Sequence, residues 1–113
     1  MCNEAVLQAI LLQISQKAQE TFGDALSNTI LFGSYARGDF ATDSDIDVMI
    51  LVDMSAEELA VYRKEICMFS TDLDLEYDVF TSIKLQDLST FEEWKDTLPF
   101  YRNVLSEGVL LSA

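Results

Sequence analysis

Two short apolar runs separated by a polar stretch constrain the fold of this 113-residue chain more than any other feature. The first run covers residues 29–32 and stops at Gly33, and the second covers residues 48–52, within a predicted strand over residues 46–52. β-Branched and aromatic runs of this length are typical of buried strands. A glycine at the end of such a run suits a sharp bend or a close approach to a ligand. We therefore predict two strands, joined by a short helix over residues 35–37, which Ser34 caps, and a polar loop over residues 39–44.

Two aspartates stand at the start of the second run. If Asp45 and Asp47 belong to the strand, their side chains share one face, because alternate strand residues point the same way. Residues 46, 48 and 50 then share the opposite face. Carboxylate oxygens are ligands that hard divalent cations prefer. A glycine–serine turn entering a helix offers backbone N–H groups to a phosphate. Together these features predict a nucleotide–metal site.

The same residues carry a family resemblance. Gly33-Ser34, ten further residues and then Asp45-Ile46-Asp47 resemble the signature of the polymerase-beta-type nucleotidyltransferase superfamily. The fuller form, with Arg37-Gly38 after the turn, most resembles its minimal nucleotidyltransferase branch. This resemblance covers most of the chain. It implies an α+β fold with α/β-like character, in which a small mixed β-sheet is flanked by helices.

The resemblance also implies an activity and its residues. The expected reaction is the Mg²⁺-dependent transfer of a nucleoside monophosphate, AMP from ATP, to a hydroxyl. Asp45 and Asp47 would be metal ligands, and two cations about 4 Å apart would suit the charge that builds on the attacking and leaving oxygens. Gly33 and Ser34 would hold the triphosphate.

A third carboxylate is expected from a neighbouring strand. Apolar and acidic residues alternate over residues 73–80, which predicts a strand after a turn at residues 70–72. Asp78 is our candidate for the third metal ligand and for the base that takes the acceptor's proton. Glu76 and Asp74 would share its face and are rivals, and an exposed acidic face without a catalytic role is the alternative.

Arg37 has two open interpretations. It lies three positions after Ser34 and is one of only seven basic residues. It could pair with a phosphate of the nucleotide. It could equally anchor the acidic loop through Asp39 or Asp43.

Helix signals account for most of the remaining chain. Apolar residues recur at spacings of three and four after Asn3, a good N-cap, and stop at Gly23. A turn over residues 24–28 follows. Ser55 and Glu58 form a capping box, as do Thr90 and Glu93, and each predicts a helix start.

Helix start and stop signals also occur in the C-terminal part of the chain. Pro99 suits the first turn of a last helix, which Gly108 ends. Residues 109–111 are an edge strand or a docked tail, and residues 82–87 are ambiguous. We find no repeat or linker, so residues 1–113 are expected to form one minimal nucleotidyltransferase domain.

Charge and composition exclude several classes of function. The net charge of −13 leaves no long cationic surface, so extended DNA or RNA is an improbable ligand. The acidity suits a basic protein partner, or serves only solubility, and both readings stay open. The chain contains no histidine, which removes histidine-ligated zinc and Ser-His-Asp chemistry.

The expected location is the cytoplasm. No apolar run is long enough to span a membrane, and the first residues do not resemble a signal peptide. Cys2 and Cys67 are the only cysteines, and their positions do not suggest a structural disulfide.

Three functions compete at this point. Many members of the minimal branch pair with a HEPN-type toxin, so the resemblance implies an antitoxin that attaches AMP to a tyrosine of such a partner. The alternative is a non-catalytic antitoxin that neutralises its partner by contact. Antibiotic nucleotidyltransferases are also similar but normally add a C-terminal helical domain. A hetero-partner or a second copy of the chain is expected to complete the acceptor side.

Overall fold

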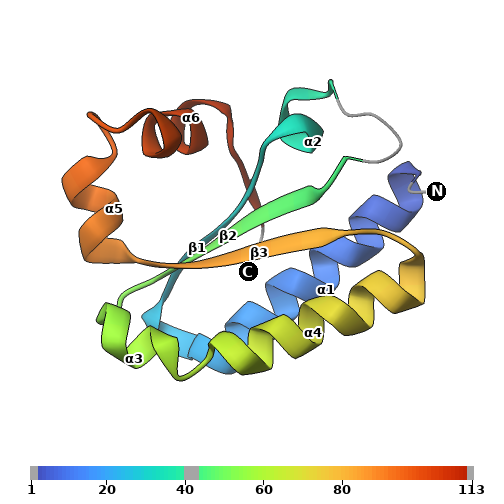
Figure 1. The fold of residues 1–113 in the computed structure, drawn as a ribbon, viewed down its shortest axis with the longest axis horizontal. Helices are drawn as coiled ribbons and strands as arrows, with labels where there is room; N and C mark the ends of the chain where they lie inside the picture. The colour runs from blue at the N-terminus through green and yellow to red at the C-terminus, as the bar shows by residue number, and fades with distance from the viewer. Residues whose placement is uncertain (1–2, 40–43, 112–113) are drawn as a thin grey trace.

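The computed structural model describes residues 3–39 and 44–111 (Figure 1). A four-stranded sheet with the strand order β3-β2-β1-β4 lies at its centre. The strands are β1 (Leu26–Phe32), β2 (Ile46–Val52), β3 (Thr81–Asp87) and β4 (Val109–Leu111). The helices are α1 (Glu4–Phe22), α2 (Ser34–Arg37), α3 (Ala56–Ala60), α4 (Arg63–Tyr77), α5 (Leu88–Trp94) and α6 (Pro99–Glu107), and a 3₁₀ turn, η1 (Gly23–Ala25), follows α1.

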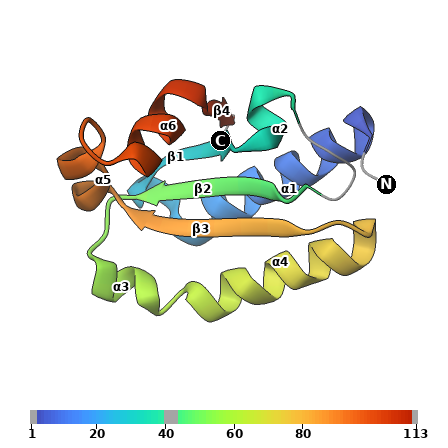
Figure 2. The same cartoon turned by 45° about the horizontal axis from the view of Figure 1, so that its top comes forward.

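The sheet is mixed, as predicted. Strand β1 runs antiparallel to both β2 and β4, whereas β2 and β3 are parallel. The parallel pair is connected through α3 and α4, which cross back to the starting end of β2 (Figure 2). As a result, β2 and β3 begin at the same end of the sheet, which is also the end where β1 stops.

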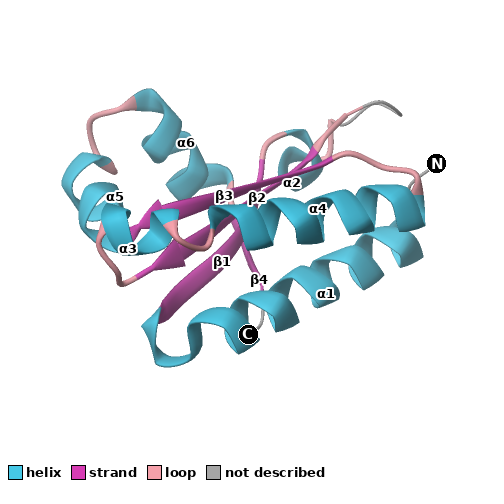
Figure 3. Cartoon of the chain, turned by 60° about the horizontal axis from the view of Figure 1, so that its bottom comes forward, coloured by secondary structure: helices cyan, strands magenta, loops and turns pink. Residues whose placement is uncertain are grey.

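Helices cover both faces of the sheet (Figure 3). Helices α1 and α4 pack on one face, over a large core that includes Ile46, Val48, Ile50 and Val52. Helices α5 and α6 lie on the other face, over a smaller core of Ile30, Met49, Leu51, Phe91 and Val104. The alternation predicted for β2 is therefore confirmed, and Asp47 shares its face with the smaller core.

Helices α1 and α4 lie side by side in opposite directions. The Lys17 ammonium pairs with Glu65 at 2.9 Å and lies over the Phe69 ring. One turn nearer the start of α1, the Gln13 amide donates to the Tyr77 hydroxyl at 2.6 Å. These contacts hold α4 against α1 along its length.

The predicted strand over residues 73–80 is wrong. Most of this segment belongs to α4, whose buried stripe runs from Ile66 to Leu73. Apolar and acidic residues alternate here, which favours a strand. However, Leu73 and Tyr77 also continue a helical spacing of three and four that begins at Ile66. The side chain of Leu75, which the strand reading would bury, is 79% exposed. The predicted turn at residues 70–72 is wrong for the same reason, and the ambiguous residues 82–87 form most of β3.

Other boundaries differ less. The N-cap Asn3 and the stop at Gly23 are confirmed for α1, as are the Ser55 capping box and the helix from Pro99 to Gly108. Strand β1 begins three residues before the predicted position, and residues 109–111 form an edge strand.

Two predicted caps are wrong. Gly33, not Ser34, is the N-cap of α2, and Asp87, not Thr90, caps α5 by accepting from the Thr90 amide at 2.9 Å. Cys67 is an exposed free thiol, whereas Cys2 lies outside the described residues. No helix among the described residues is both long and apolar enough to cross a membrane.

Candidate active site

The candidate site lies where β1 ends and where β2 and β3 begin. Phe32, the last residue of β1, is paired with Asp47 of β2. On the other side of β2, Asp47 is paired with Ser82 of β3. The backbone of Ile46 is also fixed here, because its amide donates to the Phe80 carbonyl at 2.8 Å. Three strand ends therefore surround the two aspartates.

Gly33 brings the turn after β1 against the Asp47 carboxylate. Its φ is 75° and its ψ is −156°, a region that other residues avoid. A Cβ atom at this position would overlap Asp47 Oδ2 and would lie 3.2 Å from Asp47 Cγ. Only glycine allows this approach, so the predicted juxtaposition of the turn and the acidic pair is present.

The surroundings of Asp47 disfavour ionisation of its carboxyl group. Partial burial raises the pKa of the Asp47 carboxyl, and the charge of Asp45 raises it further. The Arg37 guanidinium acts in the opposite direction and lowers that pKa. Asp45 itself is exposed, directly before the first residue of β2. A half-buried carboxylate with a second acid beside it favours the binding of a cation.

Arg37 is held by two acidic residues. Its Nε donates to Asp39 Oδ2 at 3.1 Å, and its Nη1 donates to Glu107 Oε2 at 3.2 Å. The hydrogen bond to Asp39, followed by that to Glu107, raises the pKa of Arg37. The predicted link to the loop through Asp39 is therefore present, while Asp43 lies outside the described residues. The second contact ties α2 to the end of α6, which the sequence did not indicate.

Asp78 does not lie on a strand beside Asp47. It is the C-cap of α4, exposed and in the left-handed conformation with φ of 55°. Of its rivals, Asp74 is engaged: its Oδ1 accepts from the Thr81 amide and from the Thr81 hydroxyl, both at 2.8 Å. Within residues 3–39 and 44–111, no three acidic or thiol side chains form a preassembled metal site.

Sequence reasoning missed the contribution of β3. The parallel register places Ser82 beside Asp47 and Lys84 beside Met49, on the face that carries the smaller core. The signal was the alternation of Ile83 and Leu85 with polar residues over positions 81–87. The stronger alternation over residues 73–80 competes with this signal and favours a strand one segment too early.

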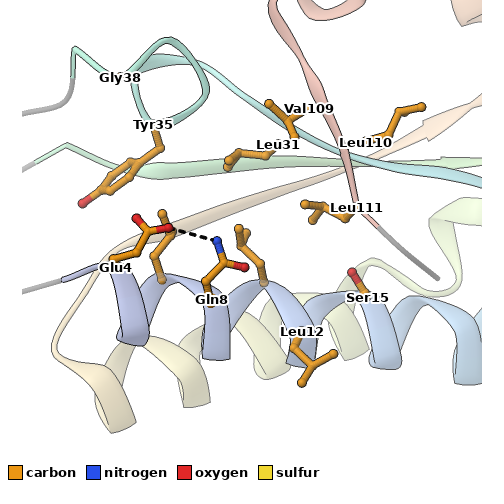
Figure 4. A pocket seen from close by; sticks show the side chains of 12 residues that line it. Glu4, Gln8, Leu12, Ser15, Leu31, Tyr35, Gly38, Val109, Leu110 and Leu111 are labelled. Carbon is orange, nitrogen blue, oxygen red and sulfur yellow. Dashed lines mark hydrogen bonds between the residues drawn. The ribbon is translucent and has the colours of Figure 1, made fainter.

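A separate pocket of about 530 Å³ is lined by residues of α1, β1, α2 and β4 (Figure 4). Tyr35 and Gly38 line it from α2 and its end, Leu31 lines it from β1, and Leu110 lines it from β4. Its remaining wall is α1, where the Gln8 amide donates to Glu4 at 3.3 Å. Asp45 and Asp47 do not line this pocket.

Comparison with known proteins decides the family. The family model described as a nucleotidyltransferase domain matches residues 11–110. The chain belongs to this family. The resemblance inferred from the Gly33-Ser34 turn and from the Asp45–Asp47 pair is therefore confirmed, and the protein is a nucleotidyltransferase.

Curated relatives of this nucleotidyltransferase come from Methanocaldococcus jannaschii. "Putative protein adenylyltransferase MJ0604" is 36% identical over 104 residues, which cover 85% of this chain and 96% of the relative. A second protein of the same description, MJ0141, is 35% identical over 75 residues, which cover 65% of this chain and 72% of the relative. The domain therefore shares most of its length with proteins named as protein adenylyltransferases.

Solved structures support the fold of the nucleotidyltransferase domain. A toxin–antitoxin crystal structure with AMP-PNP has a TM-score of 0.56 and 23% identity and covers 91% of this chain and 73% of that chain. A mutant of the toxin–antitoxin MntA-HpeT has a TM-score of 0.55 and 22% identity, with the same shares of both chains. At this level of identity the likeness concerns the fold, which agrees with the predicted mixed sheet flanked by helices.

Proposed function

We propose that this nucleotidyltransferase transfers AMP from ATP, with Mg²⁺, to a hydroxyl group of a protein. The acceptor is a tyrosine of a HEPN-type toxin, so the chain acts as an antitoxin. The observation that carries the proposal is the contact between Gly33 and the Asp47 carboxylate, with Asp45 beside it. It puts a candidate phosphate-binding turn and a pair of carboxylates within one small site.

The donor set fits magnesium. Asp45 and Asp47 offer carboxylate oxygens, and the raised pKa of Asp47 reflects burial and a neighbouring negative charge that a cation would offset. When bound, Mg²⁺ would neutralise charge on the triphosphate and stabilise the leaving pyrophosphate. Gly33 and Ser34 would hold the phosphates through the turn's backbone, and Arg37, close enough to affect Asp47, would add positive charge.

Asp78 remains our proposal for the third carboxylate, now from a loop instead of a strand. It stands two residues before Phe80, whose carbonyl is bonded to Ile46 between the two aspartates. Two residues of chain span at most about 7 Å, so its Cα lies near the site. Asp74 is bonded to Thr81, and Glu76 is bonded to the Tyr77 hydroxyl, which leaves Asp78 the better placed acid. Its role would be to accept the proton of the attacking hydroxyl.

The partner is proposed from the relatives and from charge. Relatives carry the name of protein adenylyltransferases, and solved structures of the same fold are toxin–antitoxin assemblies. The net charge of −13 suits electrostatic attraction of a basic partner. A cytoplasmic location and a single domain over residues 1–113 are part of the same proposal.

Transfer to the partner tests the proposal directly. The chain, Mg²⁺ and ATP labelled at the α-phosphate are incubated with a HEPN-type protein encoded beside it. We expect label on the partner, and a loss of about a hundredfold or more for Asp47→Asn, since metal-stabilised charge is worth several kcal/mol. Asp53→Asn is the matched control, because Asp53 is an exposed acid just after the other end of β2. An unlabelled partner that is folded and bound by the chain would refute transfer.

A contact-only antitoxin is the second candidate. It is favoured by the strong acidity and by the absence of a third clustered carboxylate among the described residues. The double variant with Asp45→Asn and Asp47→Asn separates the two functions. Full neutralisation of the partner by this variant, without transfer, would support contact alone.

A further inference from the structure

Lys84 faces the same side of the sheet as the candidate site. Alternate residues of β3 point to one face, and the neighbouring Gln86 accepts from the Tyr101 hydroxyl of α6 at 3.1 Å. Ser82, Lys84 and Gln86 therefore share the face of Asp47. From strand spacing, the Cα atoms of Lys84 and Asp47 are separated by about 8 Å, that is, one strand across and two residues along.

Aromatic rings connect the lysine to the strand end that holds the aspartates. The Lys84 ammonium lies over the Phe100 ring, 5.6 Å from its centroid. The Phe100 ring packs edge-on against Phe32, with centroids 5.6 Å apart. Phe32 is the register partner of Asp47, so their side chains are neighbours on this face. Phe32, Phe100 and Lys84 thus border the patch of sheet next to the Asp47 carboxylate.

The Lys84 charge is not committed to an acid. Lys17, Lys95 and Arg37 each form an ion pair within 4 Å, whereas Lys84 forms none with the acids that the structure describes. Among the described residues, the Lys84 ammonium has an aromatic ring, not a carboxylate, as its partner. An exposed cation–π contact is weak compared with an ion pair to a phosphate. A stronger anionic ligand can therefore draw the side chain away.

We infer that Lys84 is a positioning residue that binds the triphosphate of the nucleotide. This inference rests on the proposed function. Phosphates held near Asp45 and Asp47 need positive charge on the side away from the cation, and Lys84 supplies it from the neighbouring strand. A lysine ammonium binds phosphate as a point charge on a flexible stem. Contact with the β- or γ-phosphate would favour the triphosphate over the monophosphate.

Calorimetry with AMP-PNP and Mg²⁺ tests this assignment without relying on turnover. Lys84→Met is expected to weaken AMP-PNP binding by about tenfold or more, since a charge-assisted hydrogen bond is lost. AMP binding should change little, and Lys84→Arg should retain most of the affinity for AMP-PNP. Lys95→Met is the matched control, because Lys95 pairs with Glu92 at the protein surface.

The failures of the two proposals are distinguishable. Wild-type affinity of Lys84→Met for AMP-PNP, while Asp47→Asn loses magnesium-dependent binding, would overturn the role of Lys84 alone. Equal weakening of AMP and AMP-PNP binding in Lys84→Met would also overturn it. If the wild-type chain does not bind AMP-PNP with Mg²⁺, both the proposed function and this inference fail.

Discussion

At the residue scale, the site depends on one missing side chain. Gly33 adopts a backbone conformation that favours glycine, and it leaves room for the Asp47 carboxylate. Gly38, at the other end of α2, also has a positive φ of 84°, but a Cβ there would meet nothing within 4 Å. Both glycines therefore have a positive φ, but only Gly33 lies against Asp47, and its ψ of −156° differs from the 8° of Gly38.

This difference gives a matched pair of variants. Gly33→Ala and Gly38→Ala should each lose about 1–3 kcal/mol of unfolding free energy through backbone strain. Only Gly33→Ala should also lose nucleotide binding, because the new Cβ displaces the Asp47 carboxylate. Chemical denaturation and AMP-PNP calorimetry measure the two effects. Equal nucleotide affinity in both variants would show that the Gly33–Asp47 contact has no role in binding.

At the element scale, α4 decides where the third acid lies. The helix extends to Tyr77, and its buried residues include Ile66 and Leu73 at helical spacing. Its last turns bury Leu73, which is 2% exposed, and leave Leu75 in solvent. A strand would have placed both leucines on one buried face.

Alanine substitutions distinguish the helix from the strand. Leu73→Ala should lower the unfolding free energy by about 2–5 kcal/mol, since it removes a buried side chain. Leu75→Ala should change it by no more than about 0.5 kcal/mol. Urea denaturation of both variants measures the difference. Comparable losses would instead support the alternating strand pattern.

Helix α5 makes a pH-dependent prediction through its N-cap. Burial favours protonation of Asp87, but the hydrogen bonds with Thr90 outweigh it and lower the pKa of the carboxyl. Because the pKa is lower in the folded state, the stabilisation is present above the unfolded value of 3.8 and is lost as the pH falls through the folded pKa.

The variants Asp87→Ala and Asp87→Asn measure this contribution. Asp87→Ala should cost about 1 kcal/mol at neutral pH, since a capping side chain is lost. That cost should shrink as the pH falls below 3.8. The difference between Asp87→Asn and Asp87→Ala should stay nearly constant, because asparagine caps without titrating. Thermal melts across the acidic range measure both, and a cost that does not depend on pH would contradict the assignment.

At the scale of the whole molecule, features that depend on local sequence patterns could be predicted, whereas features that depend on strand pairing could not. The strands β1 and β2 and the turn at Gly33 were predictable because short apolar runs, a glycine and a D-x-D pair are local signals. The third carboxylate was misplaced because an alternating sequence satisfies a strand period and, at every fourth residue, a helix period. Lys84 was missed because only the pairing of β3 with β2 brings it to the site, and no local signal encodes that pairing.

The net charge of −13 leads to a prediction for the whole chain. Like charges repel within the folded state, and salt screens that repulsion. Salt also screens the attractive ion pairs, but these are exposed and should contribute little to stability. Raising the sodium chloride concentration should therefore raise the melting temperature, as scanning calorimetry would measure. A lower melting temperature in salt would mean that attractive pairs dominate.

The two-sided cover of the sheet has a consequence for how such enzymes diversify. The layer of α1 and α4 supports the large core and never meets the face that carries Asp47. The C-terminal helices α5 and α6 lie over that face and contribute Phe100 and Glu107 near the candidate site. Replacement of these helices alone would change the surroundings of the candidate site. The strand that bears the aspartates would still pack on the large core of α1 and α4, so ligand selectivity could change without loss of the fold.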